Sequence, residues 1–189
     1  MKALETLPEG YKEYYSLDLQ KDKRTAIFVN SMAVLIAVLM IVPMNFAVPI
    51  FSTIHADLGT IMRLFALSVL LIVYLILHEL VHGIAMKSCG TKKVKYGFTG
   101  LYAFAGSNDY YDKKSYIYIA LAPIVLWGII IAIINFLVPI EWFWVVYFIQ
   151  ITNLSGAAGD LFVTVKFSRF PKDILIKDHG VGMTVYSKE

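Results

Sequence analysis

The sequence has a single cysteine and few charged residues, and each shortage excludes a class of protein. Cys89 is the only cysteine among 189 residues, so no disulfide can form within the chain and a disulfide-stapled scaffold is excluded. Charged residues make up 16% of the chain and the net charge is +3, without an arginine-rich patch interleaved with aromatic residues. We therefore expect no nucleic-acid partner.

Apolar residues, in contrast, make up 58% of the chain and gather in long blocks. Four blocks cover approximately residues 26–50, 61–86, 116–138 and 142–165. A helix needs about 20 apolar residues to cross the hydrocarbon core of a bilayer, so each block is long enough to span it. We predict an all-α membrane protein with about four transmembrane helices. A polar stretch through Arg24 precedes the first block, which we expect to stay as an anchor and not to be cleaved as a signal peptide.

The segments outside these blocks indicate extended structure. Residues 94–104, between the second and third predicted helices, alternate aromatic and small side chains and predict a β-hairpin or an extended loop. The tail from Phe170 onward also has the pattern of extended chain. We divide the chain into an N-terminal segment (1–25), one transmembrane domain (26–169) and a C-terminal tail (170–189).

The distribution of lysine and arginine gives an orientation, since both accumulate on the cytoplasmic side of a membrane. Basic residues precede the first predicted helix, lie between the second and third, and follow the fourth. The other two connections contain only Arg63. We therefore predict a multi-pass protein of the plasma membrane with both termini cytoplasmic.

One motif carries recognisable chemistry: the second predicted helix ends in His78-Glu79-Leu80-Val81-His82-Gly83. Residues four apart on a helix project from one face, so both imidazoles can reach one ion. Glu79 would lie beside this ion without binding it, as the candidate general base for a water molecule. Ionisable residues are costly inside apolar helices, which favours a functional interpretation of the motif.

A catalytic zinc ion normally has three protein ligands, so the motif requires one more. Asp160 is the only acidic residue in the fourth apolar block. The second and fourth predicted helices run in the same direction, and His82 and Asp160 precede their ends by similar short distances. We predict Asp160 as the third ligand, with an acid that merely reaches for the membrane interface as the alternative.

Other residues near this depth have two interpretations each. Asn153 lies two turns before Asp160 on much the same face, and its amide can donate to a ligand or to a developing oxyanion. Ordinary hydrogen bonding between helices explains Asn153 equally well. The small residues 156–159 allow close approach of a neighbour, which could be the second helix. Pro123 either opens the third helix locally or only kinks it.

These motifs resemble the zincin peptidase family of small bacterial membrane proteins and, more distantly, the site-2 protease class of intramembrane zinc metalloproteases. The resemblance implies a bacterial protein with Zn²⁺ as cofactor, bound by His78, His82 and Asp160. In the site-2 class the third ligand is often within Leu-Asp-Gly, and Gly159-Asp160-Leu161 departs from this pattern.

The site-2 class also has a membrane-associated β-loop after its HExxH helix, which is thought to receive an unwound substrate segment. Residues 94–104 could take this role by strand addition, with a purely structural hairpin as the alternative.

We predict from these observations an intramembrane zinc-dependent endopeptidase. Its substrates would be membrane proteins or peptides, entering from the lipid bilayer and cut near the cytoplasmic face. The alternative is a catalytically silent zincin-like protein that acts as a regulator or a binding module. Metal transport is less favoured, because transporters usually distribute ionisable residues along a path across the bilayer, and here they gather at one end.

Overall fold

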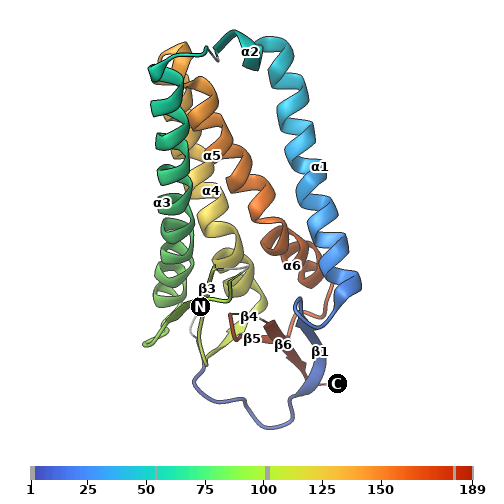
Figure 1. Cartoon of the computed structure of the whole chain (residues 1–189). Coiled ribbons are helices and arrows are strands. Elements are labelled where there is room, and N and C mark those ends of the chain that lie inside the picture. The colour runs from blue at the N-terminus through green and yellow to red at the C-terminus, as the bar shows by residue number, and fades with distance from the viewer. Residues whose placement is uncertain (1–2, 54, 101–102, 181, 189) are drawn as a thin grey trace.

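The computed structural model of the chain describes residues 3–53, 55–100, 103–180 and 182–188, and most of them are helical. Three helices are long and apolar enough to cross a membrane: α1 (Lys23–Ala47), α3 (Leu58–Ser88) and α4 (Lys113–Leu137). Two shorter helices complete the bundle, α5 (Phe143–Gly156) and α6 (Ala158–Ser168) (Figure 1). The connections contain two single turns, α2 (Ile50–Thr53) and the 3-10 helix η1 (Ile140–Trp142).

Each of the three long helices begins after an aspartate that caps it. The carboxylates of Asp22, Asp57 and Asp112 accept hydrogen bonds from the backbone N–H three residues further on, at 3.1, 2.7 and 2.9 Å. An N-cap of this kind contributes about 1 kcal/mol, because it satisfies a backbone donor that the first turn leaves unpaired. The caps therefore fix the residue at which each long helix starts.

The long helices direct most of their apolar side chains outward. Over their most apolar stretches only 6% of α1, 6% of α3 and 28% of α4 is buried. Phe46, Phe65 and Phe136 are 83%, 71% and 89% exposed. A surface of this kind would aggregate in water, whereas lipid tails are as apolar as the side chains themselves. The helix surface is thus compatible with membrane association.

The fourth apolar block differs from the single transmembrane helix predicted for it. Helix α5 ends at Gly156 and α6 begins at Ala158, with Ala157 between them at φ −85° and ψ 19°. Two glycines flank this point, and each costs about 1 kcal/mol in a helix interior relative to alanine. The break therefore falls where the helix is weakest. Among the described residues, three helices and not four meet the length and apolarity of a span.

The break also changes the expected neighbours of the small residues 156–159. Helix α3 packs against α5, while α6 packs against α4 and α1. A Cβ atom at Gly159 would meet nothing within 4 Å, so no close helix contact requires this glycine. Residues Gly156, Ala158 and Gly159 instead line the cavity described below.

A four-stranded antiparallel sheet at one end of the bundle is the second departure from the all-α prediction. Its strands follow the order β1 (Lys12–Asp18), β6 (Gly182–Ser187), β5 (Leu175–Asp178) and β4 (Tyr110–Asp112). The N-terminal segment therefore pairs with the C-terminal tail, and both lie at the same end of the molecule (Figure 1).

The predicted hairpin after the second helix is present as a separate two-stranded sheet. Strand β2 (Lys95–Phe98) pairs with β3 (Ala103–Gly106), and Phe104 lies opposite Gly97. The Phe104 ring also covers Gly180 in the turn between β5 and β6, where a Cβ atom would lie 2.1 Å from the ring. The hairpin is thus held against the C-terminal tail by this aromatic side chain and by the backbone N–H of Ser107, directly after β3, which donates to the Asp178 carbonyl at 3.0 Å.

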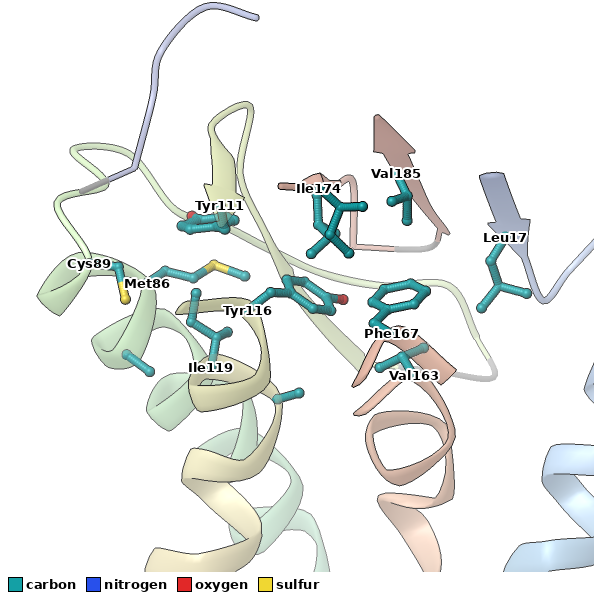
Figure 2. Close-up of a cluster of buried hydrophobic side chains, with 13 residues drawn as sticks. Leu17, Met86, Cys89, Tyr111, Tyr116, Ile119, Val163, Phe167, Ile174 and Val185 are labelled. Atoms are coloured by element: carbon teal, nitrogen blue, oxygen red, sulfur yellow. The ribbon is translucent and has the colours of Figure 1, made fainter. Parts of the chain in front are cut away.

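The main buried cluster lies between the four-stranded sheet and the adjacent helix ends (Figure 2). Tyr111 of β4, Phe167 of α6 and Val185 of β6 are completely buried. Met86 and Cys89, at the end of α3, belong to the same cluster. This shared core fixes α6 relative to the end of α3.

The contact between Phe104 and Gly180 leads to a stability prediction. Gly180 has φ +88°, which costs an alanine about 1–2 kcal/mol, and the new methyl group would also have to displace the Phe104 ring. We expect Gly180→Ala to lower the free energy of unfolding by roughly 2–4 kcal/mol, measured by denaturant unfolding in detergent micelles.

Gly10→Ala is the matched control. Gly10 has φ +84° but no atom within 4 Å of its Cβ position, so only the backbone term applies. Equal losses for the two variants would show that the Phe104 contact contributes nothing.

Candidate metal centre

Helix α3 brings the side chains of His78 and His82 to one face, near the end of the helix that lies next to the four-stranded sheet. Each residue is 8% exposed. The two ring centroids are 4.9 Å apart and the rings are nearly perpendicular, at 77°. This is the arrangement that the four-residue spacing predicts, and it turns both rings toward the same point.

Asp160 meets the two imidazoles from the first turn of α6. Its Oδ2 atom lies 3.6 Å from Nε2 of His78 and 3.5 Å from Nε2 of His82. A tetrahedral zinc ion with ligand distances of about 2.0–2.2 Å would separate two ligand atoms by roughly 3.4 Å. His78, His82 and Asp160 thus form a group whose ligand atoms, all within 4.8 Å of one another, could hold a metal ion.

A hydrogen-bond chain fixes the ring of His78. The Tyr74 hydroxyl donates to Oδ1 of Asn153 at 2.9 Å, and Nδ1 of His78 lies 2.9 Å from the same hydroxyl. The Tyr74 hydroxyl has only one proton and donates it to Asn153. Its oxygen can therefore only accept from His78, so Nδ1 of His78 carries a proton. The Nδ2 atom of Asn153 donates in turn to the carbonyl of Ile124 at 3.1 Å. When the imidazole is neutral, this chain leaves Nε2 of His78 with a free lone pair.

His82 is held by the backbone of α4. Its Nδ1 atom lies 2.9 Å from the carbonyl oxygen of Ile119, and a carbonyl can only accept, so Nδ1 carries the proton. In its neutral form each histidine therefore directs an Nε2 lone pair toward the Asp160 carboxylate. Three acceptors facing one another repel unless a cation or a proton lies between them. The donor set and its supporting hydrogen bonds fit a zinc ion.

Glu79 lies beside this group, on the wall of a cavity of about 450 Å³. His78, His82 and Asp160 line the same cavity. The backbone N–H of Ala105, in β3 of the hairpin, lies near the Glu79 carboxylate and favours its negative charge. A carboxylate next to three residues that could hold a metal ion, in a space large enough for water, could accept a proton from a water molecule.

The local electrostatics favour a negative charge at the third ligand. Asp160 lies in the first turn of α6, where the unpaired N–H groups and the helix dipole stabilise a carboxylate. A second carboxyl group, that of Asp178, also lines the cavity, and burial raises its pKa. Asp178 accepts hydrogen bonds from the Tyr116 hydroxyl and from the Gly180 N–H, both at 2.8 Å. Its oxygens are therefore already engaged within the protein.

The structure gives Asn153 a definite set of contacts. Asn153 is completely buried, and both ends of its amide are hydrogen-bonded, to Tyr74 of α3 and Ile124 of α4. Its bonds run between helices and reach the ligand His78 through Tyr74. A direct role in stabilising an oxyanion stays a prediction.

Tyr74 was not singled out by the sequence, although a signal exists. Residues 74, 78 and 82 are spaced four apart, so they form one stripe on α3. The carbonyl of Ile119 could not be found in this way, because every residue has a carbonyl.

The two remaining histidines lie elsewhere. The backbone N–H of His55 donates to the Thr60 hydroxyl at the start of α3. This position is at the opposite end of the helix from the candidate metal centre. The backbone N–H of His179 donates to the Gly182 carbonyl in the turn between β5 and β6. His179 is therefore a turn residue and not part of the candidate centre.

The chain belongs to the family described as "Putative zincin peptidase", whose model matches residues 70–175. This range includes the second half of α3, the hairpin, α4, α5 and α6. Zincin peptidases are zinc metallopeptidases, so the family agrees with the donor set of the site. The bacterial origin and the relation to the site-2 class stay predictions.

One curated relative is the "Uncharacterized 24.7 kDa protein in gap 5'region" of Pyrococcus woesei. It is 34% identical over 118 residues, which cover 60% of this chain and 51% of the relative. The chain thus matches about half the length of this relative. No solved structure matches the chain.

The chain from His78 to Asn153 leads to a prediction about metal affinity. Tyr74→Phe keeps the buried ring but removes the hydroxyl that accepts from His78, which frees the imidazole to change its tautomer and orientation. Loss of such an outer-shell partner typically weakens metal binding about 10–100-fold, and we expect a zinc affinity reduced by that factor, measured by chelator competition.

Tyr147→Phe is the control. The Tyr147 hydroxyl donates to the carbonyl of Met40, so this variant also loses one interhelical hydrogen bond, but away from the metal ligands. A similar affinity loss in both variants would assign the effect to general loosening of the bundle.

Proposed function

We propose that the protein is an intramembrane zinc-dependent endopeptidase that hydrolyses peptide bonds of membrane proteins or membrane-associated peptides near the cytoplasmic face. One observation carries the proposal: the Nε2 atoms of two imidazoles and a carboxylate converge next to Glu79. The family agrees with this chemistry at the level of a metallopeptidase.

In the proposed mechanism His78, His82 and Asp160 would hold the ion. A zinc ion bound there would lower the pKa of a water molecule to about 7 and polarise the scissile carbonyl. Glu79 accepts the proton of the attacking water and delivers it to the leaving amine. The nearby N–H of Ala105 would help to orient the Glu79 carboxylate for this proton transfer.

The shape of the cavity supports a substrate that enters from the lipid. Its walls include Ala26, Val29 and Ala33 of α1 as well as Leu75 of α3, all small or apolar. Helix α1 packs mainly against α5 and α6, which leaves the side of the cavity between α1 and α3 as the entry we propose. An apolar peptide segment fits these walls better than a charged soluble peptide does.

We also propose that the hairpin presents the substrate. Strand β3 contacts α3 and places the backbone of Ala105 at Glu79. An extended segment lying alongside β3 would have its peptide bonds next to the general base and the metal ligands.

The role of Glu79 has a direct test. Glu79→Gln removes the proton acceptor but no metal ligand, so we expect zinc to remain bound while cleavage falls about 10²–10⁴-fold or below detection. The measurement is cleavage of single-pass membrane proteins co-expressed with the full chain, with the zinc content of the purified protein determined in parallel.

His78→Ala is the reference in this experiment, since it should lose both zinc and cleavage. Unchanged turnover in Glu79→Gln would remove Glu79 as the base. Identical cleavage profiles for wild type and His78→Ala would favour the catalytically silent alternative.

The third ligand is tested by zinc stoichiometry in purified protein. Asp160→Asn keeps the size of the side chain but removes the charge that balances the ion. We expect wild type to carry one zinc ion per chain, and Asp160→Asn to be substoichiometric.

Asp178→Asn provides the matched control, because it removes a second carboxylate that lines the same cavity and already accepts two hydrogen bonds. This variant should keep its zinc. Full occupancy in Asp160→Asn would show that another group completes the site.

A further inference from the structure

Pro123 lies in the interior of α4 and is completely buried. In an α-helix the N–H of each residue donates to the carbonyl four residues before it. Proline has no N–H, so the carbonyl of the residue four before it loses its regular donor. In α4 that carbonyl belongs to Ile119, the residue whose carbonyl accepts from His82.

A buried carbonyl without a donor is destabilising, and inside an apolar bundle water does not readily supply one. The Nδ1–H of His82 fills this position at 2.9 Å. Conversely, the buried imidazole of His82 needs an acceptor for Nδ1–H if Nε2 is to keep its lone pair. Each group satisfies the need of the other.

We propose that Pro123 is a positioning residue of the metal centre. Because residue 123 has no N–H, no helical N–H at this position competes with His82 for the Ile119 carbonyl. This carbonyl then fixes the tautomer and the ring orientation of His82. The inference rests on the proposed metal centre, but it concerns a hydrogen bond that exists without the metal. Pro123 itself touches neither substrate nor reacting atoms.

The environment of Pro123 distinguishes it from an ordinary helix kink. The Ile124 carbonyl, one residue beyond Pro123, accepts from Asn153 in the chain that holds His78. Both metal-binding imidazoles are therefore supported by α4 carbonyls on either side of this proline. Pro43, the proline inside α1, is exposed, and so is Leu39, four residues before it.

The test compares Pro123→Ala with Pro43→Ala in the full chain in detergent. Alanine at 123 restores an N–H that competes for the Ile119 carbonyl, so we expect the dissociation constant for zinc to rise about 10–100-fold. Pro43→Ala makes the same chemical change away from the centre and should leave zinc affinity unchanged.

A second readout uses the metal-free protein. In wild type, the imidazole of His82 should give an Nδ1–H signal protected by its hydrogen bond in nitrogen-15 NMR of labelled histidines. This signal should be lost or exchange faster in Pro123→Ala, a change that a purely structural role for the proline would not produce. If wild type binds no zinc, the proposed function fails, while the imidazole signal still decides the role of Pro123.

A backbone ester separates the missing N–H from the proline ring. Lactic acid at position 123 has the side chain of alanine but no N–H, and we expect it to restore zinc affinity and the His82 signal toward wild type. Wild-type affinity with an unchanged His82 signal in Pro123→Ala would overturn the proposal. The proposal would also be overturned by an ester variant that keeps its helices but shows neither wild-type zinc affinity nor the His82 signal. Because the ester variant is compared directly with wild type, this test remains valid even if Pro123→Ala fails to fold.

Discussion

The candidate metal centre depends on the hydrogen-bond partners that its buried imidazoles have outside the site. A histidine can bind a metal through Nε2 only if the proton sits on Nδ1, and inside an apolar bundle that proton needs an acceptor. His78 obtains one from the side chain of Tyr74, and His82 obtains one from the backbone carbonyl of Ile119. Packing of α3 against α4 and α5 thus determines the chemical state of both ligands.

The third ligand depends on a different part of the molecule. Asp160 belongs to α6, which starts only because the fourth apolar block breaks at Ala157. The direction of α6 is fixed by the core that it shares with the sheet, in which Phe167 is completely buried. The N-terminal strand and the C-terminal tail therefore help to hold Asp160 at the histidines.

Local patterns in the sequence predicted the parts of the molecule that depend on neighbouring residues. The spacing of His78 and His82 gave their common face, the apolar blocks gave the long helices, and the alternation in 94–104 gave the hairpin. Asp160 could be proposed from depth because two parallel helices end at the same level. The sheet escaped prediction because β1 has a mostly polar sequence and pairs with β6, more than 160 residues away.

The supporting hydrogen bonds escaped prediction for another reason. A backbone carbonyl such as that of Ile119 is chemically the same at every position, so only its surroundings make it special. In the sequence only Pro123 indicates that the Ile119 carbonyl lacks its usual helical donor. From the sequence alone, this proline could equally open the helix locally or only kink it. A proline in an apolar helix indicates a functional role only when the structure shows which residue donates to the carbonyl that the proline leaves without a helical donor.

The two kinds of ligand also differ in how they would respond to metal. The histidine side chains are 10% exposed and held by hydrogen bonds that do not involve an ion, whereas the Asp160 side chain is 27% exposed and faces two lone pairs. Without a cation or a proton between the three groups, its charge is opposed by those lone pairs and favoured by the start of α6. A bound cation would turn this repulsion into attraction between α6 and α3. Metal binding and docking of α6 should therefore stabilise each other, and the ion would act as a structural link as well as a catalytic group.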